Sequence, residues 1–87
     1  MSERIPCCVP FCNRTAARLR YPDAEEIICG KHYRLASAVL RRRLTKVRRL
    51  SRRIRAGDEG KLRQSWHLDN ELWRRIKRQA IELAVGL

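Results

Sequence analysis

The arrangement of cysteine and histidine is the feature that most restricts how this chain can fold. Cys7, Cys8 and Cys12 stand near the N-terminus, and Cys29 is followed three residues later by His32. Positions 29 and 32 project from one face of a helix, and the positive end of the helix dipole favours the Cys29 thiolate. Spacings of two to four residues within each ligand pair are typical of structural zinc. The sequence therefore predicts a closed, tetrahedral Cys3His zinc site.

Disulfides and free buried thiols are the alternatives to zinc for these cysteines. Four cysteines allow three disulfide pairings, but a disulfide framework leaves the position of His32 unexplained. The chain also lacks the secretory signal that usually accompanies such a framework. The spacing does not decide between Cys7 and Cys8, because both distances to Cys12 are admissible. Adjacent residues point in different directions, so we expect one of the two to be a spare thiol.

The length of the chain is a second reason to expect a metal. A chain of 87 residues buries only somewhat more than half of the surface that it exposes when unfolded. So small a core needs a further stabilising element, which a bound metal ion would supply.

No apolar run approaches the roughly 18 residues of a membrane-spanning helix. We therefore expect a soluble, cytoplasmic protein of one small domain.

Positive charge is concentrated in one part of the sequence. The chain carries 21 Lys and Arg against 9 Asp and Glu, a net charge of +12. Residues 31–56 hold eleven of these cations and no acidic residue, whereas the segments on either side are nearly neutral. Like charges at such close spacing repel, and the usual compensation is an anionic partner such as nucleic acid or an acidic membrane surface.

The spacing of apolar residues predicts two long helices after a turn-rich head. Apolar residues recur every three or four positions over residues 33–54, which indicates one continuous helix. A second stripe over residues 72–83 predicts another helix, with Ser65 or Asp69 as its N-cap. The link of residues 56–60 is short enough to fold the two helices into an antiparallel pair.

The N-terminal pattern resembles a known family. The string Cys7-Cys8-Val9-Pro10-Phe11-Cys12, followed after sixteen residues by Cys29-Gly30-Lys31-His32-Tyr33, resembles the treble-clef zinc finger at the start of many bacteriophage HNH-type endonucleases. It is also similar to small phage and prophage zinc-finger proteins. In their pattern the first cysteine is followed by a variable residue and then by Val-Pro. The resemblance therefore implies the ligands Cys7, Cys12, Cys29 and His32, with Cys8 as the variable position.

The same resemblance, which covers about the first 40 residues, implies a fold for the head. A treble clef implies a small β-hairpin over residues 13–28, with apolar contacts from Leu19, Tyr21, Ile27 and Ile28. We therefore expect a mainly α chain, with a zinc-binding head over residues 1–32 and a basic helical hairpin over residues 33–87. The two parts are expected to fold as one cooperative domain.

The endonuclease resemblance also raises the question of catalysis. An HNH nuclease needs a histidine as general base and further side chains that hold a catalytic metal ion. Here His32 is assigned to zinc, and His67 would have to act without a second catalytic residue. We therefore expect no enzymatic activity.

The basic segment predicts contacts with phosphates. Arginine predominates in it, and its guanidinium group suits bidentate phosphate contacts better than the lysine ammonium does. On a helical wheel the cations form two adjoining strips. The candidate nucleic-acid contacts are Arg34, Arg41, Arg42, Lys46, Arg48, Arg49, Arg52 and Arg53.

We expect the partner to be nucleic acid, DNA more than RNA, bound with low sequence specificity by a phage or mobile-element accessory or regulatory protein. A membrane is disfavoured, because Trp66 and Trp73 fall in the nearly neutral second helix, where we expect both to pack against the first helix. The alternative is a protein interaction module whose helical faces join another chain, including a second copy.

Overall fold

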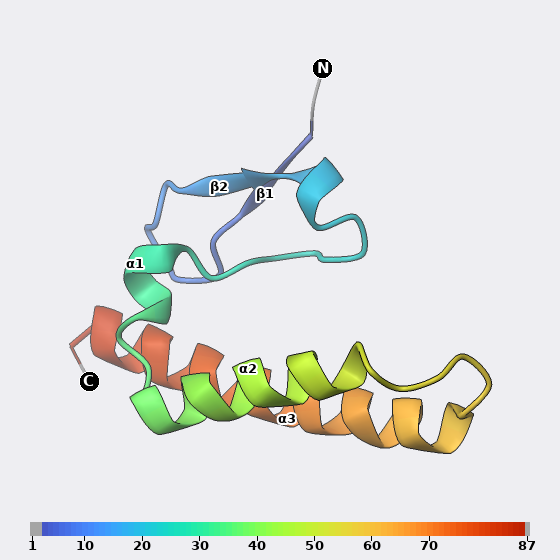
Figure 1. Ribbon diagram of the computed structural model, residues 1–87. Helices are drawn as coiled ribbons and strands as arrows, with labels where there is room; N and C mark the ends of the chain where they lie inside the picture. Colours follow the sequence, from blue (N-terminus) through green and yellow to red (C-terminus); the bar gives the residue numbers. More distant parts are fainter. Residues whose placement is uncertain (1–2, 87) are drawn as a thin grey trace.

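The structure is a computed structural model that describes residues 3–86, and most of its regular structure is helical. This confirms the mainly α class. Figure 1 shows the order of the elements along the chain. They are strand β1 (Arg4–Pro6), strand β2 (Thr15–Ala17), the 3-10 helix η1 (Arg18–Arg20), and helices α1 (Gly30–Tyr33), α2 (Ala38–Ser51) and α3 (Glu59–Ala84).

The two strands of the head flank the first three cysteines. β1 and β2 pair in antiparallel register, with Arg4 opposite Ala17 and Pro6 opposite Thr15. The alternation of the strand buries Ile5 completely, while its neighbours stay exposed. A short parallel bridge follows, in which the Cys8 N–H donates to the carbonyl of Ile27 at 2.7 Å.

The prediction of a β-hairpin over residues 13–28 is wrong, because β2 pairs with β1. The segment that should have formed its second strand includes η1 and the turn that carries Pro22, which has no N–H to donate to a strand ladder. Of the expected apolar contacts, Ile27 and Ile28 are half-buried, whereas Leu19 is 89% exposed.

The prediction of a single helix over residues 33–54 is also wrong. α1 ends at Tyr33, and the chain bends before α2 begins at Ala38. The backbone of Ser37 is not helical, with φ of −49° and ψ of 130°, and its N–H donates to Oε1 of Gln79 at 2.7 Å instead of to a carbonyl one turn earlier. A contact with α3 therefore accompanies a break in the helix, at a place where the apolar stripe of the sequence continues without interruption.

α3 begins earlier than expected, which corrects the proposed caps Ser65 and Asp69. The helix starts at Glu59, and the Asp58 side chain accepts a hydrogen bond from the Lys61 N–H at 3.3 Å. An aspartate there satisfies one of the N–H groups that a helix start leaves without a partner. Ser65 and Asp69 instead lie inside α3 and contact α2.

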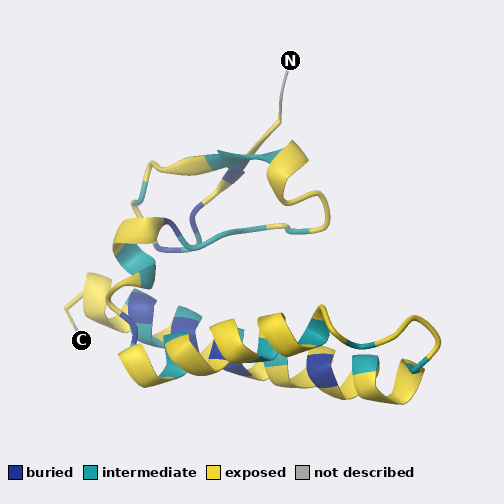
Figure 2. Cartoon of the chain, in the orientation of Figure 1, coloured by how far each residue is buried: buried dark blue, intermediate teal, exposed yellow. Residues whose placement is uncertain are grey.

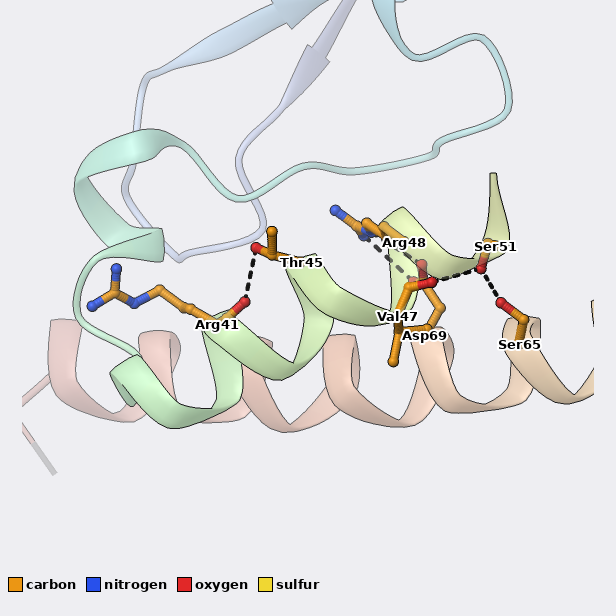
Figure 3. A network of polar contacts seen from close by, with 7 residues as sticks. All are labelled: Arg41, Thr45, Val47, Arg48, Ser51, Ser65 and Asp69. Carbon is orange, nitrogen blue, oxygen red and sulfur yellow. Dashed lines mark hydrogen bonds and ion pairs between the residues drawn. The ribbon is translucent and has the colours of Figure 1, made fainter. Parts of the chain in front are cut away.

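α2 and α3 lie side by side, and their sequences run in opposite directions along the contact (Figure 1). The Ser37–Gln79 bond lies at one end, and a hydrogen bond between the hydroxyls of Ser51 and Ser65 lies at the other. Arg48 and Asp69 form an ion pair between these ends (Figure 3). The core between the helices is small, and its buried residues are Ala36, Leu44, Leu72 and Ile76.

The two tryptophans have different surroundings. Trp73 packs against the core between the helices, as expected, but Trp66 is 62% exposed, so the expectation that it is a core residue is wrong. Head residues such as Ile27 and Ile28 line the same pocket as Trp73. Trp66 lies two turns nearer the α2–α3 loop, about 10 Å farther along the helix axis.

The molecule is flat and exposes much of its surface. Its principal extents are 41 × 36 × 14 Å, and Figure 2 shows exposed residues along most of the helix surfaces. The accessible surface is 7113 Å², against about 5,400 Å² for a compact protein of this mass. Within residues 3–86, no helix has the length and apolar character needed to cross a bilayer. The fold therefore buries a smaller share of its surface than a compact protein of the same mass.

Candidate metal centre and basic groove

Two parts of the head contribute the four candidate metal ligands. Cys7 follows β1, and Cys12 lies in the turn that leads to β2. Cys29 is the N-cap of α1, and His32 lies in that helix one turn later. The parallel bridge between Cys7 and Ile27 brings the two parts together. The structure therefore collects all four side chains that the resemblance implied.

The potential ligand atoms of these residues all lie within 4.8 Å of one another. Sγ of Cys29 lies 3.1 Å from Nδ1 of His32 and 3.9 Å from Sγ of Cys12. Sγ of Cys7 lies 3.7 Å from the same histidine nitrogen and accepts a hydrogen bond from the Cys29 N–H at 3.4 Å. Three thiols and one ring nitrogen thus surround a common centre.

The dimensions of this cluster fit a tetrahedral metal ion. Zinc bonds of about 2.3 Å to sulfur and about 2.1 Å to nitrogen separate two sulfurs by about 3.8 Å and a sulfur from a nitrogen by about 3.6 Å. The 3.9 Å distance between the Cys12 and Cys29 sulfurs and the 3.7 Å distance from the Cys7 sulfur to His32 Nδ1 lie close to these values, and the Cys29–His32 distance of 3.1 Å is shorter. Soft thiolate donors with one imidazole are also the set that zinc prefers. The cluster could therefore hold a metal ion, and its geometry is compatible with zinc.

The thiols of the cluster differ in how readily they ionise. Burial opposes ionisation of Cys29, but hydrogen bonds from the His32 backbone N–H and from the Cys12 thiol outweigh it and lower the Cys29 pKa. For Cys12, a hydrogen bond from the Arg14 backbone favours the thiolate, but desolvation and the thiols of Cys7 and Cys29 together raise its pKa. The surroundings of Cys29, at the start of α1, therefore favour its thiolate, the form that binds a metal cation.

Cys8 lies outside this cluster, although it is adjacent to Cys7. It packs against the buried residues around the cluster, and its backbone N–H is bonded to Ile27. Burial and the neighbouring Cys7 and Glu26 raise the pKa of the Cys8 thiol to about 11. Cys8 is therefore a protonated side chain beside the cluster.

Phe11, in the turn between Cys7 and Cys12, was not singled out by sequence reasoning. Its φ is +66°, a left-handed conformation that a bulky side chain rarely adopts, and it is 99% exposed. A phenylalanine there strains the backbone and adds no packing. Glycine and asparagine are the residues that tolerate such a conformation. Because position 11 is neither of them, the residue type there did not predict the left-handed turn.

The eight predicted nucleic-acid contacts fall into three groups. α2 carries Arg41, Arg42, Lys46, Arg48 and Arg49. Arg34 is the residue after α1, and Arg52 and Arg53 follow α2, so these three lie outside the helix that was expected to present all eight. The two continuous strips of the helical wheel are therefore shorter than expected.

Four of the α2 cations line one groove. It lies between Tyr33 and the outer side of α2, and its lining consists of Tyr33, Ala38, Arg41, Arg42, Thr45, Lys46 and Arg49. No acidic residue contributes to that lining. Tyr33, Ala38 and Thr45 are the groove residues that the charge pattern did not identify, because none of them is charged. We call this surface the basic groove.

Arg48 is held differently from the groove cations. Its guanidinium group donates to both carboxylate oxygens of Asp69, at 3.0 and 3.4 Å (Figure 3). Within residues 3–86 it is the one cation of the basic segment that forms an ion pair. A carboxylate of α3 therefore offsets its charge at the surface of the helix pair.

Comparisons of the chain with models of protein families, with curated proteins and with solved structures found no match.

Proposed function

We propose that this chain is a zinc-stabilised module that binds nucleic acid through phosphate contacts, with low sequence specificity and DNA preferred over RNA. The observation that carries the proposal is the basic groove, where four cations of α2 lie together without an acidic neighbour. Repulsion among them destabilises the free protein, and a phosphate backbone removes that cost. We propose binding without catalysis, in the role of a phage or mobile-element accessory or regulatory protein in the cytoplasm.

The head is proposed to be a zinc-bound treble clef that holds the groove in place. Cys7 and Cys12 would supply two ligands from the turn after β1, and Cys29 and His32 two from α1. The turn that carries two ligands and the helix that starts at a third support this assignment, although the antiparallel strands are β1 and β2 and not a hairpin within residues 13–28. Tyr33 follows His32 directly and forms one wall of the groove, so an ion at this site would fix that wall.

The helices support low specificity rather than base reading. Cations spread along the outer side of one helix reach the phosphates of many sequences, and contacts to phosphates carry no sequence information. The α2–α3 pair, which we propose to be a stable antiparallel hairpin, gives these cations a rigid support. Ser51, Ser65 and the Arg48–Asp69 pair join its two helices (Figure 3).

The experiment compares two triple variants that lose the same charge. Arg42, Lys46 and Arg49 are exposed groove residues, and all three are changed to Gln. The control changes the exposed Arg63, Arg74 and Arg78 of α3 to Gln. Binding of both variants and of the parent to unrelated DNA duplexes, RNA duplexes and heparin is measured by mobility shift or anisotropy.

We expect the groove variant to lose affinity by a similar factor on every DNA sequence, and the control variant to lose much less. Equal losses in both variants would mean that net charge, and not the groove, determines binding. If the parent bound neither DNA nor RNA, the alternative of a protein interaction module, including a second copy of the chain, would replace the proposal. Circular dichroism and solution mass accompany the binding data.

A further inference from the structure

A second pocket lies beside the basic groove and differs from it in character. It has a volume of about 300 Å³ and lies between the head segment 21–28 and the helices. Three aromatic side chains line it: Tyr21 from the head, Tyr33 from α1 and Trp73 from α3. The aliphatic side chains of Ile27 and Ile28 complete its apolar lining. We call it the aromatic pocket.

The aromatic pocket and the basic groove share a wall. Tyr33 lines both of them, and α2 contributes Arg48 to the pocket and Arg41 to the groove. A strand whose phosphates lie in the groove therefore lies beside Tyr33, which is one of the three aromatic residues that line the pocket. Binding sites for single-stranded nucleic acid combine these two elements, because the phosphates need cations and the bases need flat apolar surfaces.

The two charged residues of the pocket are already paired. The Glu26 carboxylate forms an ion pair with Lys77, and Arg48 pairs with Asp69. The Lys77 ammonium also lies 5.4 Å from the centroid of the Trp73 ring. The lining is therefore aromatic with balanced charges, and its Glu26 oxygens and Arg48 nitrogens can accept from and donate to the edge of a heterocycle.

We propose that the aromatic pocket receives an unpaired nucleobase of the strand whose phosphates occupy the basic groove. The inference rests on the proposed function and deepens it, because it names single-stranded nucleic acid as the preferred substrate. The base stacks against the aromatic rings that line the pocket, while the neighbouring phosphates contact the groove cations. A base paired within a duplex cannot enter without leaving its partner, so duplexes bind more weakly.

The test uses Trp73 as a fluorescent reporter. Trp66 is exposed and lies outside the core clusters, so Trp66→Phe leaves Trp73 as the one tryptophan without removing core packing. This protein is titrated with a short oligodeoxythymidylate and with an abasic deoxyribose-phosphate strand of the same length. Both strands carry the same phosphates, and only the first carries bases.

We expect the thymidylate strand to quench Trp73 and to bind roughly 5- to 150-fold more tightly than the abasic strand, the factor that stacking of one base supplies. Equal affinities with no change in Trp73 fluorescence would overturn the inference and leave the proposed function standing. If neither strand nor a duplex bound, the proposed function itself would fail. The two failures are thus distinguishable.

A pair of variants locates the base. Tyr21 is 40% exposed and outside the core clusters, so Tyr21→Ala shortens the pocket wall without unfolding the chain. The matched control is Leu19→Ala, because Leu19 is an exposed apolar residue of the neighbouring helix η1 and does not line the pocket. We expect Tyr21→Ala to weaken binding of the thymidylate strand at least about fivefold, without affecting the abasic strand. An equal effect on both strands, or the same loss in Leu19→Ala, would place the base elsewhere.

Discussion

The backbone N–H of Ser37 donates a hydrogen bond to the side-chain oxygen of Gln79, 42 residues later in the chain. Ser37 directly precedes α2, where helical N–H groups have no partner within the helix. The bond therefore attaches the start of α2 to the last third of α3. It also marks the bend that separates α2 from α1, and hence the position of Tyr33 relative to the basic groove.

Removing this acceptor should destabilise the protein. We expect Gln79→Leu to lower the free energy of unfolding by about 1–2 kcal/mol, because a half-buried N–H loses its partner. Gln79→Glu keeps an oxygen at the same place, and its charge suits a helix start, so it should retain most of the stability. Urea denaturation followed by circular dichroism measures both. Equal stability of Gln79→Leu and the parent would contradict this role.

The core between the helices should depend on few residues. Leu44 is completely buried between α2 and α3, and Leu44→Ala is expected to cost about 2–5 kcal/mol of unfolding free energy. Leu50 belongs to the same apolar stripe but is 49% exposed, so Leu50→Ala should cost less than about 1 kcal/mol. Thermal unfolding of the two variants compares them directly. Similar losses would mean that the helices pack differently.

Metal content should separate Cys8 from the other cysteines. We expect one metal ion per chain, lost in Cys12→Ser, Cys29→Ser and His32→Ala and kept in Cys8→Ser, because Cys8 lies outside the cluster. Atomic emission on dialysed protein gives the stoichiometry. Loss of metal in Cys8→Ser, together with its retention in Cys7→Ser, would reverse the assignment of the ligand.

Binding to duplex DNA should weaken steeply with salt. If each of the four groove cations neutralises one phosphate, the slope of log affinity against log salt is near −4, since each contact adds about −0.9. Lys46→Gln alone should flatten the slope by about one unit. Anisotropy titrations over a salt series test this. A slope near zero would exclude phosphate contacts as the main source of affinity.

Asp69 should restrain binding while it supports the fold. Asp69→Asn releases Arg48, so we expect higher affinity for nucleic acid, with a loss of stability below about 1 kcal/mol because the pair is partly exposed. Glu71→Gln makes the same charge change on α3, where Glu71 pairs with Arg75 one turn away. Only the first variant should raise affinity. A similar rise in both would point to net charge as the cause.

The metal cluster was accessible to sequence reasoning because its ligands come in two local pairs. Cys29 and His32 lie one helical turn apart, and Cys7 and Cys12 flank one turn, so short-range geometry determines each pair. The meeting of the two pairs depends on the bridge between Cys7 and Ile27, which leaves no periodic signal in the sequence. The choice of Cys7 over Cys8 needed the family resemblance for the same reason.

The helix boundaries were less accessible, because distant residues set them. An apolar stripe looks the same in one helix as in two helices whose faces align, and the break before α2 depends on Gln79 in α3. Asp58 caps α3 as an aspartate ordinarily does. The glycines on both sides of Asp58 and Glu59, however, are typical of a loop, so the sequence indicated a later start for the helix. Trp73 shares a pocket with head residues whereas Trp66 is exposed, and no local pattern encodes this difference.

Ile81 of α3 packs against the cluster formed by Cys7, Val9 and Cys29, one residue after Ala80, which is fully buried. The head and the helix pair therefore share a boundary, so we expect them to unfold together, and an ion held by the thiols would act on the whole folding equilibrium by mass action. Free metal at a hundred times its dissociation constant adds about 2.7 kcal/mol to stability. We expect that gain to extend to residues as remote from the thiols as Leu44, so the melting temperature of the helices would report the concentration of free metal.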